Sequence, residues 1–227
     1  NIALPSMPRG EVTEEAKTLL RLGFAFMLSG LLMMGASYGV RAIILRMEGL
    51  DAAGFYTAAW TLGGLYVGII LQAMGAAFYP RLVGVADDTR ECNRLVNEQT
   101  LVSLLLAGPG VIGTIIFAPL IISLFYSPQF VEAVEILRWI CLGIAMRVIT
   151  WPIGFIIVAK NRQLLFINAE FGWPLVNITL TWGCVDEFGV VGAGIAFFGS
   201  YLFHLILVYP IVRRLTGFRW SLRNVQT

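Results

Sequence analysis

Six long apolar stretches run through this sequence, and each is long enough to cross a membrane. A bilayer core about 30 Å thick needs about 20 apolar residues in a helix, because each residue adds about 1.5 Å. The stretches cover residues 20–45, 54–79, 101–125, 137–159, 164–185 and 190–212. They show no strand-like alternation, and helices satisfy every backbone hydrogen bond within lipid. We therefore expect an all-α fold, a polytopic bundle of six transmembrane helices.

The composition excludes several other classes of protein. Hydrophobic residues make up 58% of the chain and charged residues 13%, against about 45–50% and about 25% in soluble domains. These values exclude a disordered chain, and a net charge of +2 does not indicate a partner nucleic acid. Three cysteines lack metal-ligand spacing, so we expect no metal site. Since the chain starts at Asn1 without a signal-peptide pattern, we expect it to be part of a longer protein.

The connections between the apolar stretches alternate in basic content. One set carries most of the Lys and Arg residues: Arg9, Lys17, Arg21, Arg81, Arg90, Arg94, Lys160, Arg162, Arg213, Arg214, Arg219 and Arg223. The other set carries two arginines beside six acidic residues: Arg46, Arg138, Glu48, Asp51, Glu132, Glu135, Asp186 and Glu187. The positive-inside rule then predicts that both termini and the segment 80–99 are cytoplasmic. Native Cys92 should accordingly escape an impermeant thiol reagent added from outside.

Two ionisable residues lie well inside apolar stretches. Arg147 is near the middle of residues 137–159, and Glu170 is in the cytoplasmic half of residues 164–185. A charge at membrane depth costs about 2.5–3.5 kcal/mol and usually faces a bundle interior or a water-filled path. One interpretation is a buried ion pair that joins two helices. The other is a polar lining, with Arg147 binding substrate and Glu170 as the candidate for ion coupling.

Polar and small residues recur at helical spacing on three of the stretches. The three sets are Gly30, Ser37 and Arg41; Thr61, Gly68, Gln72 and Tyr79; and Glu170, Asn177 and Thr181. Such spacing places the members of each set on one helix face. We favour a lined cavity, in which Arg41, Gln72 and Asn177 join Arg147 as candidate substrate-binding residues. The alternative is a seam of hydrogen bonds between packed helices, which uses the same residue types.

Other features are less specific. Pro152 and Pro174 fall inside apolar stretches, and residues 108–110 (Gly-Pro-Gly) are expected to interrupt the third; proline kinks of this kind mark a transport path or a static bend. His204, the one histidine, is interpreted as a packing residue whose polar atoms are satisfied. Metalloprotease, P-loop and nucleophile-elbow motifs are absent from the sequence, so we expect neither catalytic residues nor a cofactor.

Six short segments together resemble a known transporter family. They are residues 53–59 (AGFYTAA), 77–82 (AFYPRL), 118–126 (APLIISLFY), 136–139 (ILRW), 193–196 (AGIA) and 216–221 (TGFRWS). Their order and spacing across nearly the whole chain resemble the oligosaccharide flippase (O-antigen translocase) family. That family lies within the multidrug/oligosaccharidyl-lipid/polysaccharide exporter superfamily.

The resemblance implies a two-lobe exporter fold, with this chain as the second six-helix lobe. Residues 1–17 would be a cytoplasmic linker, 18–215 the lobe, and 216–227 a cytoplasmic tail leading to a missing C-terminal part. The implied partners are membrane lipid, the missing N-terminal lobe and a lipid-linked oligosaccharide of the polyprenyl pyrophosphate type. That substrate would cross the bacterial inner membrane by alternating access. Arginine suits a diphosphate because its planar fork donates two parallel hydrogen bonds.

Three other functions remain open at this point. A drug or cation antiporter of the same superfamily would use Glu170 as its coupling acid. An integral-membrane glycan-processing enzyme would need a large outer loop with catalytic residues, which the sequence lacks. A scaffold subunit would not need polar stripes on several helices.

Overall fold

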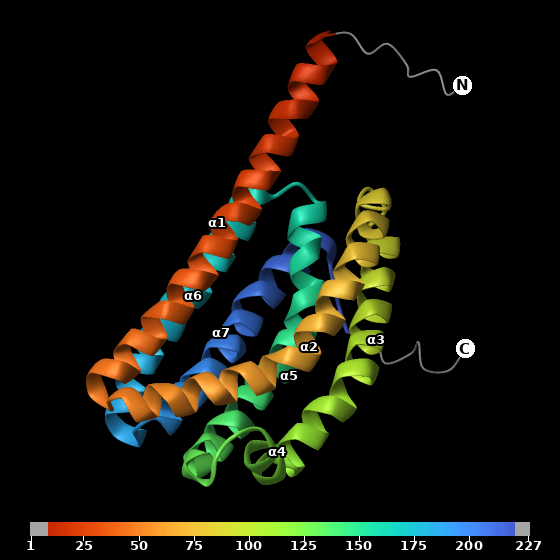
Figure 1. The fold of residues 1–227 in the computed structure, drawn as a ribbon. Coiled ribbons are helices and arrows are strands. Elements are labelled where there is room, and N and C mark those ends of the chain that lie inside the picture. The colour runs from red at the N-terminus through yellow and green to blue at the C-terminus, as the bar shows by residue number, and fades with distance from the viewer. Residues whose placement is uncertain (1–8, 221–227) are drawn as a thin grey trace, which may run out of the picture.

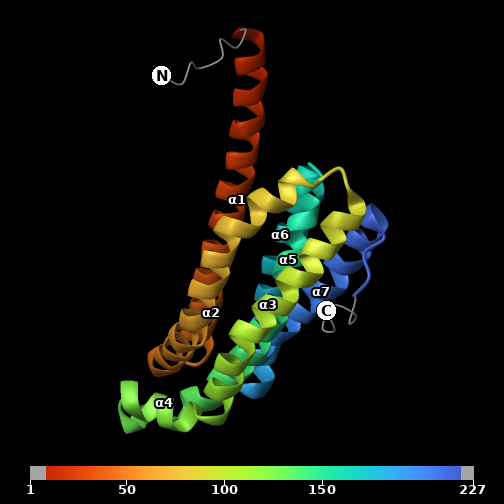
Figure 2. The ribbon, with the colours of Figure 1, turned by 90° about the vertical axis from the view of Figure 1, so that its right-hand side faces the viewer.

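The computed structural model describes residues 9–220, and within them the chain is all-α, as predicted (Figure 1). The elements are α1 (Arg9–Met47), α2 (Leu50–Gly84), α3 (Thr89–Ile116), α4 (Ala118–Phe125), a 3₁₀ turn η1 (Pro128–Glu132), α5 (Ala133–Ala159), α6 (Gln163–Phe188) and α7 (Val191–Thr216). The six long helices correspond to the six predicted stretches. The N-terminal part of α1 extends beyond the bundle in both Figures 1 and 2.

Five of the long helices are apolar enough to cross a membrane: α1 within Met27–Met47, α2, α3, α5 and α7. Helix α6 has the length, since 26 residues extend about 39 Å at about 1.5 Å each. Its apolar run is interrupted by Asn168, Glu170 and Asn177, and it is not among the five. The helix that corresponds to the predicted fifth span therefore carries polar residues that need partners within the bundle.

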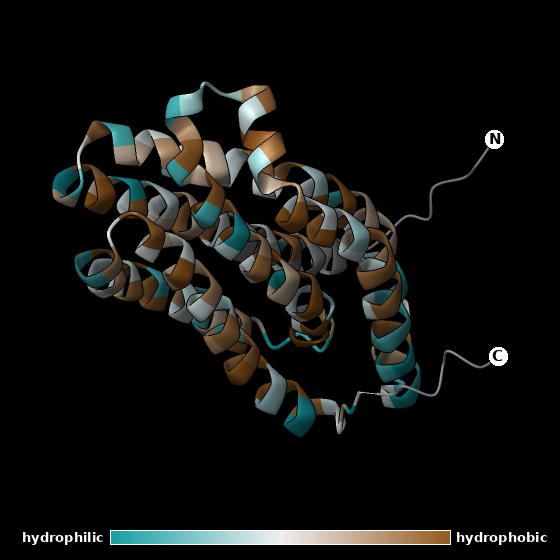
Figure 3. Cartoon of the chain, turned by 90° about the horizontal axis from the view of Figure 1, so that it is seen from below, coloured by the Kyte–Doolittle hydropathy of each residue, from teal (hydrophilic) through white to brown (hydrophobic). Residues whose placement is uncertain are grey.

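Helix α5 forms the centre of the bundle and packs against α2, α3 and α7. Its buried side chains include Ile136, Leu137 and Ile140, all fully inaccessible. On the outside of the bundle, large apolar side chains such as Leu105 and Ile206 remain exposed, which suits contact with lipid chains. Figure 3 shows apolar residues along much of the helices, with many of the hydrophilic residues near helix ends.

Close packing of α7 explains the glycine-rich run near its start. A Cβ added at Gly192 would lie 2.0 Å from the backbone oxygen of Cys184, and one at Gly194 would lie 2.8 Å from Cβ of Trp139. Side chains at these two positions would push α7 away from α6 and α5. These two glycines are thus required by helix packing.

The third predicted stretch is two helices instead of one. Helix α3 ends at Ile116, and α4 (Ala118–Phe125) turns across the end of the bundle (Figure 2). Pro119 lies in the first turn of α4, where a proline is tolerated because its missing N–H has no helical partner there. The interruption expected at residues 108–110 is wrong, since α3 continues through Pro109.

The predicted basic connections meet at one end of the bundle. The ammonium of Lys160, after α5, donates a hydrogen bond to the backbone oxygen of Ala86 between α2 and α3. The amide of Asn93 donates to the backbone oxygen of Thr216 at 2.8 Å. These bonds join the α2–α3 turn, the α5–α6 turn and the end of α7. Figure 1 shows the start of α1 on the same side.

Candidate functional site

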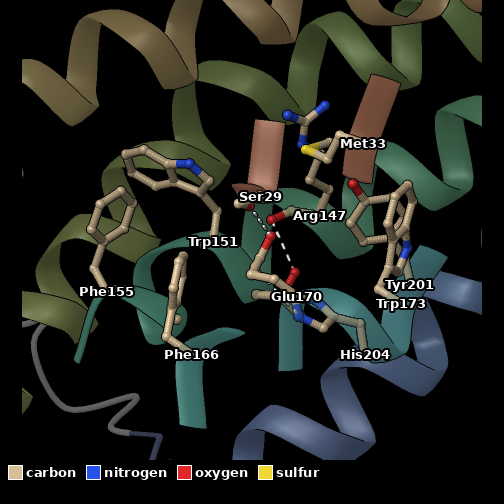
Figure 4. Close-up of a pocket in the computed structure, with 12 residues that line it drawn as sticks. Ser29, Met33, Arg147, Trp151, Phe155, Phe166, Glu170, Trp173, Tyr201 and His204 are labelled. Atoms are coloured by element: carbon tan, nitrogen blue, oxygen red, sulfur yellow. Dashed lines mark hydrogen bonds and ion pairs between the residues drawn. The ribbon is translucent and has the colours of Figure 1, made fainter. Parts of the chain in front are cut away.

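A cavity of about 210 Å³ lies among α1, α5, α6 and α7. Arg147 on α5 and Glu170 on α6 both line it, together with Ser29 of α1 and His204 of α7 (Figure 4). The two charges that are isolated in the sequence therefore share one pocket. It lies between helices that are far apart in the chain, so no single segment could have revealed it.

Glu170 has polar neighbours on two sides within this pocket. Its Oε2 accepts a hydrogen bond from the Ser29 hydroxyl at 2.9 Å, and its Oε1 lies 4.0 Å from Nε2 of His204. Arg147 is near enough to act on the carboxyl electrostatically. However, these two side chains form no ion pair within 4.0 Å, so the direct pair that one interpretation expects is not formed.

One wall of the pocket is aromatic. Trp151 and Phe155 lie on α5 with their ring centroids 4.7 Å apart, and Phe166 on α6 also lines the cavity. Trp173 and Tyr201 form a second pair with centroids 5.1 Å apart. Aromatic walls with a few convergent polar groups are typical of sites for organic ligands.

Several polar groups at the pocket lack partners. Nε1 of Trp173 and both ring nitrogens of His204 are buried and have no hydrogen-bond partner among the residues that the structure describes. The guanidinium of Arg147 likewise has no hydrogen-bond or ion-pair partner there. The expectation that the polar atoms of His204 are satisfied is therefore wrong. Because unpaired buried polar groups are costly, their gathering at one cavity points to a ligand, ion or water.

The other three candidate residues lie outside the pocket. Asn177 is 4% exposed and donates a hydrogen bond to the Ser200 hydroxyl at 3.0 Å, so it joins α6 to α7. Arg41 on α1 donates to Thr57 on α2 at 3.4 Å. Gln72 is exposed on α2. The pocket thus unites Arg147 with Glu170 and adds Ser29, His204 and the aromatic wall.

Two proteins of known sequence are similar to this chain. The "Putative O-antigen transporter" of Shigella flexneri is 24% identical over 160 residues, which cover 70% of this chain and 38% of that protein. The "Uncharacterized membrane protein in cps region" of Klebsiella pneumoniae is 23% identical over 205 residues, covering 90% and 42%. The chain therefore spans less than half the length of the relatives it matches.

Solved structures show the same fold. An outward-facing multidrug resistance MATE family transporter of the MOP superfamily matches with a TM-score of 0.84 at 15% identity, over 96% of this chain and 49% of that one. A MOP superfamily transporter from Pyrococcus furiosus matches with a TM-score of 0.74 at 19% identity, over 93% and 48%. The model of a family described as "Polysaccharide biosynthesis protein" matches residues 2–135. The chain belongs to this polysaccharide biosynthesis protein family and has the helical fold of MOP superfamily transporters.

Proposed function

We propose that the chain forms one lobe of a transporter that moves a lipid-linked oligosaccharide across the bacterial inner membrane by alternating access. Its family membership supports a polysaccharide substrate, and its fold supports transport. The observation that carries the proposal is the pocket among the long helices, which combines an aromatic wall with Arg147 and Glu170. We propose a role in movement of the substrate, without chemical change.

The chemistry of such a substrate suits this pocket. Hydrocarbon offers no hydrogen bonds, so a sugar–diphosphate headgroup needs a polar shelter while it crosses. The guanidinium of Arg147 has free donors for the two phosphates of a polyprenyl pyrophosphate carrier. Trp151 and Phe155 offer apolar ring faces on which sugar rings can lie.

A second lobe would face α1 and α2. Arg41 bonds Thr57 on this side of the lobe, and Thr61 and Gln72 follow Thr57 at helical spacing with exposed side chains. A polar face on helices that cross a membrane requires a partner other than lipid. The relatives' greater length supports a missing N-terminal lobe of the same polypeptide as that partner. Arg41 and Gln72 would then contribute to a central cavity.

We predict that the basic end of the bundle faces the cytoplasm. Cys92 cannot test this, because its thiol is 0% exposed and would escape labelling from either side. Exposed positions are better probes: Asp87 lies in the α2–α3 turn, and Glu187 lies at the opposite end, in the last turn of α6. In a Cys184→Ser background, an impermeant maleimide added to intact cells should label Glu187→Cys and leave Asp87→Cys unlabelled. The reverse pattern would invert the orientation.

The transport function is tested by reconstitution of the protein, with any further segment that its gene encodes, into vesicles. A fluorescent polyprenyl diphosphate oligosaccharide is placed in one leaflet, and its accessibility to a membrane-impermeant quencher is followed. We expect the protein to speed its crossing well above the rate in protein-free vesicles. Crossing at the protein-free rate would refute the proposal.

A drug or cation antiporter is the second candidate function. It is favoured by the presence of a carboxyl, Glu170, in the same pocket as the rings of Trp173 and Phe166, since aromatic faces and a negative charge both attract organic cations. The same vesicles distinguish the two functions. An antiporter would expel a fluorescent aromatic cation and leave the lipid-linked sugar in its leaflet.

A further inference from the structure

We propose that Glu170 and His204 together form a proton-binding site, so that the ion driving this transporter is the proton. The inference rests on the proposed transport function and adds His204, to which the sequence gives no functional role. In this site the imidazole and the carboxyl share one exchangeable proton, taken from water on one side of the membrane and released on the other. The charge of the pair changes by one with each turn of the cycle.

The geometry of the pair carries the proposal. Nε2 of His204 lies 4.0 Å from Oε1 of Glu170, and the two side chains are only 12% and 25% exposed. This separation is too long for a hydrogen bond, but a small side-chain movement or one bridging water closes it. Both imidazole nitrogens lack a hydrogen-bond partner among the side chains that the structure describes. A buried imidazole with two unpartnered nitrogens can accept a proton from water and, as an imidazolium, pair with the carboxylate beside it.

The other groups around the site favour a proton over a metal cation. Hard metal cations take about six or more oxygen ligands, whereas the close groups around this pair supply the carboxyl of Glu170 and the hydroxyl of Ser29. Among the described residues, no group of three or more His, Cys, Asp or Glu could hold a metal ion. A proton needs only one acceptor atom.

Every helix packed around the pair contributes to its electrostatic surroundings. Arg147 faces it from α5, and Tyr201 lies on α7 one turn before His204. The described α1 side chains at the pocket are Ser29 and Met33, and neither is titratable near neutral pH. A proton on His204 therefore gives the Glu170 carboxylate a second positively charged neighbour beside Arg147.

Proton binding is thereby linked to the position of α1. Without the proton, the Ser29 hydroxyl is the hydrogen-bond donor that holds Glu170, at 2.9 Å. An imidazolium at His204 would draw the carboxylate toward α7 and compete with Ser29. Occupancy of the proton site thus weakens the polar contact between α1 and α6, and a change in that contact in turn changes proton affinity.

The test uses the fact that His204 is the one histidine in this sequence. The protein is labelled with ¹³C-histidine, purified without a histidine tag, placed in lipid nanodiscs and titrated by NMR. The His204→Gln variant identifies the His204 signal. We expect that signal to show one transition within about pH 4–9. The midpoint should move by about one pH unit in Glu170→Gln, since a charged neighbour is removed. It should stay unchanged in Glu187→Gln, a matched change far from the pocket.

The transport arm uses the vesicles described above with either a pH gradient or a Na⁺ gradient. A pH gradient should drive movement of the lipid-linked sugar, a Na⁺ gradient should not, and His204→Gln and His204→Asn should each lower the pH-driven rate at least tenfold. The proton site is refuted if His204 shows no transition, if Glu170→Gln leaves its midpoint unchanged, or if Na⁺ alone drives transport. Failure of the transport function is distinct: the sugar would not move under either gradient, while the NMR titration still decides whether the pair binds a proton.

Discussion

Replacing Arg147 by alanine should slow the movement of a lipid-linked oligosaccharide by about tenfold to a hundredfold. A hydrogen bond to a charged group contributes about 1.5–3 kcal/mol, and about 1.4 kcal/mol corresponds to a factor of ten. The amount of protein in the membrane should remain near normal, because the Arg147 guanidinium has no hydrogen-bond or ion-pair partner among the described residues that its loss would leave unpaired. The vesicle assay measures the rate, and immunoblotting of membranes measures the abundance.

Two further variants separate charge, geometry and structure. Arg147→Lys keeps the charge and loses the planar fork, so it should rescue the rate only in part if two phosphate oxygens are bound together. Arg138→Ala is the matched control, since Arg138 is an arginine of the same helix whose ion pair with Glu135 lies outside the pocket. A normal rate in Arg147→Ala would refute a substrate role. Loss of the protein from the membrane would show that Arg147 acts in folding.

The sequence predicted the fold because membrane-spanning helices depend on one local property, apolar length. Each of the six stretches contains most of a long helix, and the basic connections meet at one end of the bundle. The errors arose where apolar length alone could not show where one helix ends and the next begins. Apolar residues continue from α3 into α4, so only Pro119, at the start of α4, marks the boundary. Pro109 has a similar signal, yet α3 continues through it, because neighbouring helices can accommodate a proline within a bundle.

The site was harder to predict because it depends on which helices meet. Glu170 and Asn177 share one face of α6, and that face packs against α7 in an antiparallel register. Glu170 lies opposite His204, and Asn177 opposite Ser200. The cavity and the seam that the sequence analysis gives as alternatives are therefore two parts of one interface between α6 and α7. The two helices are hydrogen-bonded at Asn177 and leave a cavity between them at Glu170. Helical spacing shows the shared face, but it cannot show where the two helices separate.

The residues that sequence reasoning missed follow from the same limit. Nothing in their own helices distinguishes Ser29 and His204 as site residues. Both are identified only by their positions next to Glu170. The aromatic residues of the wall are equally compatible with simple core packing until the cavity is seen. An isolated charge such as Arg147 or Glu170 is conspicuous in an apolar stretch, whereas a serine or a tryptophan is not.

We expect Glu170→Gln to abolish gradient-driven transport while the protein still folds and binds its substrate. Glutamine keeps the shape of the side chain and an oxygen that can accept the hydrogen bond from Ser29, which the structure gives as 2.9 Å. It loses the charge that any coupling ion would neutralise. Movement of the lipid-linked sugar down its own gradient should continue, whereas movement driven by an ion gradient should fall to the background rate. Both rates are measured in the same vesicles.

Ser29→Ala is the matched variant that separates coupling from structure. It removes the hydrogen bond from Ser29 and leaves the carboxylate, so it should loosen the contact between α1 and α6. Ion-driven transport should become slower because the link to α1 is weakened, but it should not be abolished as in Glu170→Gln. Glu170→Ala removes the charge and the hydrogen bond together and leaves Arg147 without the nearby negative charge that acts on it. If the two residues matter as a structural pair, adding Arg147→Ala to Glu170→Ala should restore thermal stability, since an unpaired buried charge is worse than none. If Glu170 matters for coupling, the double variant should remain unable to use a gradient. Unchanged transport and stability in both Glu170 variants would refute both roles and leave the carboxyl as a polar group in a wet crevice.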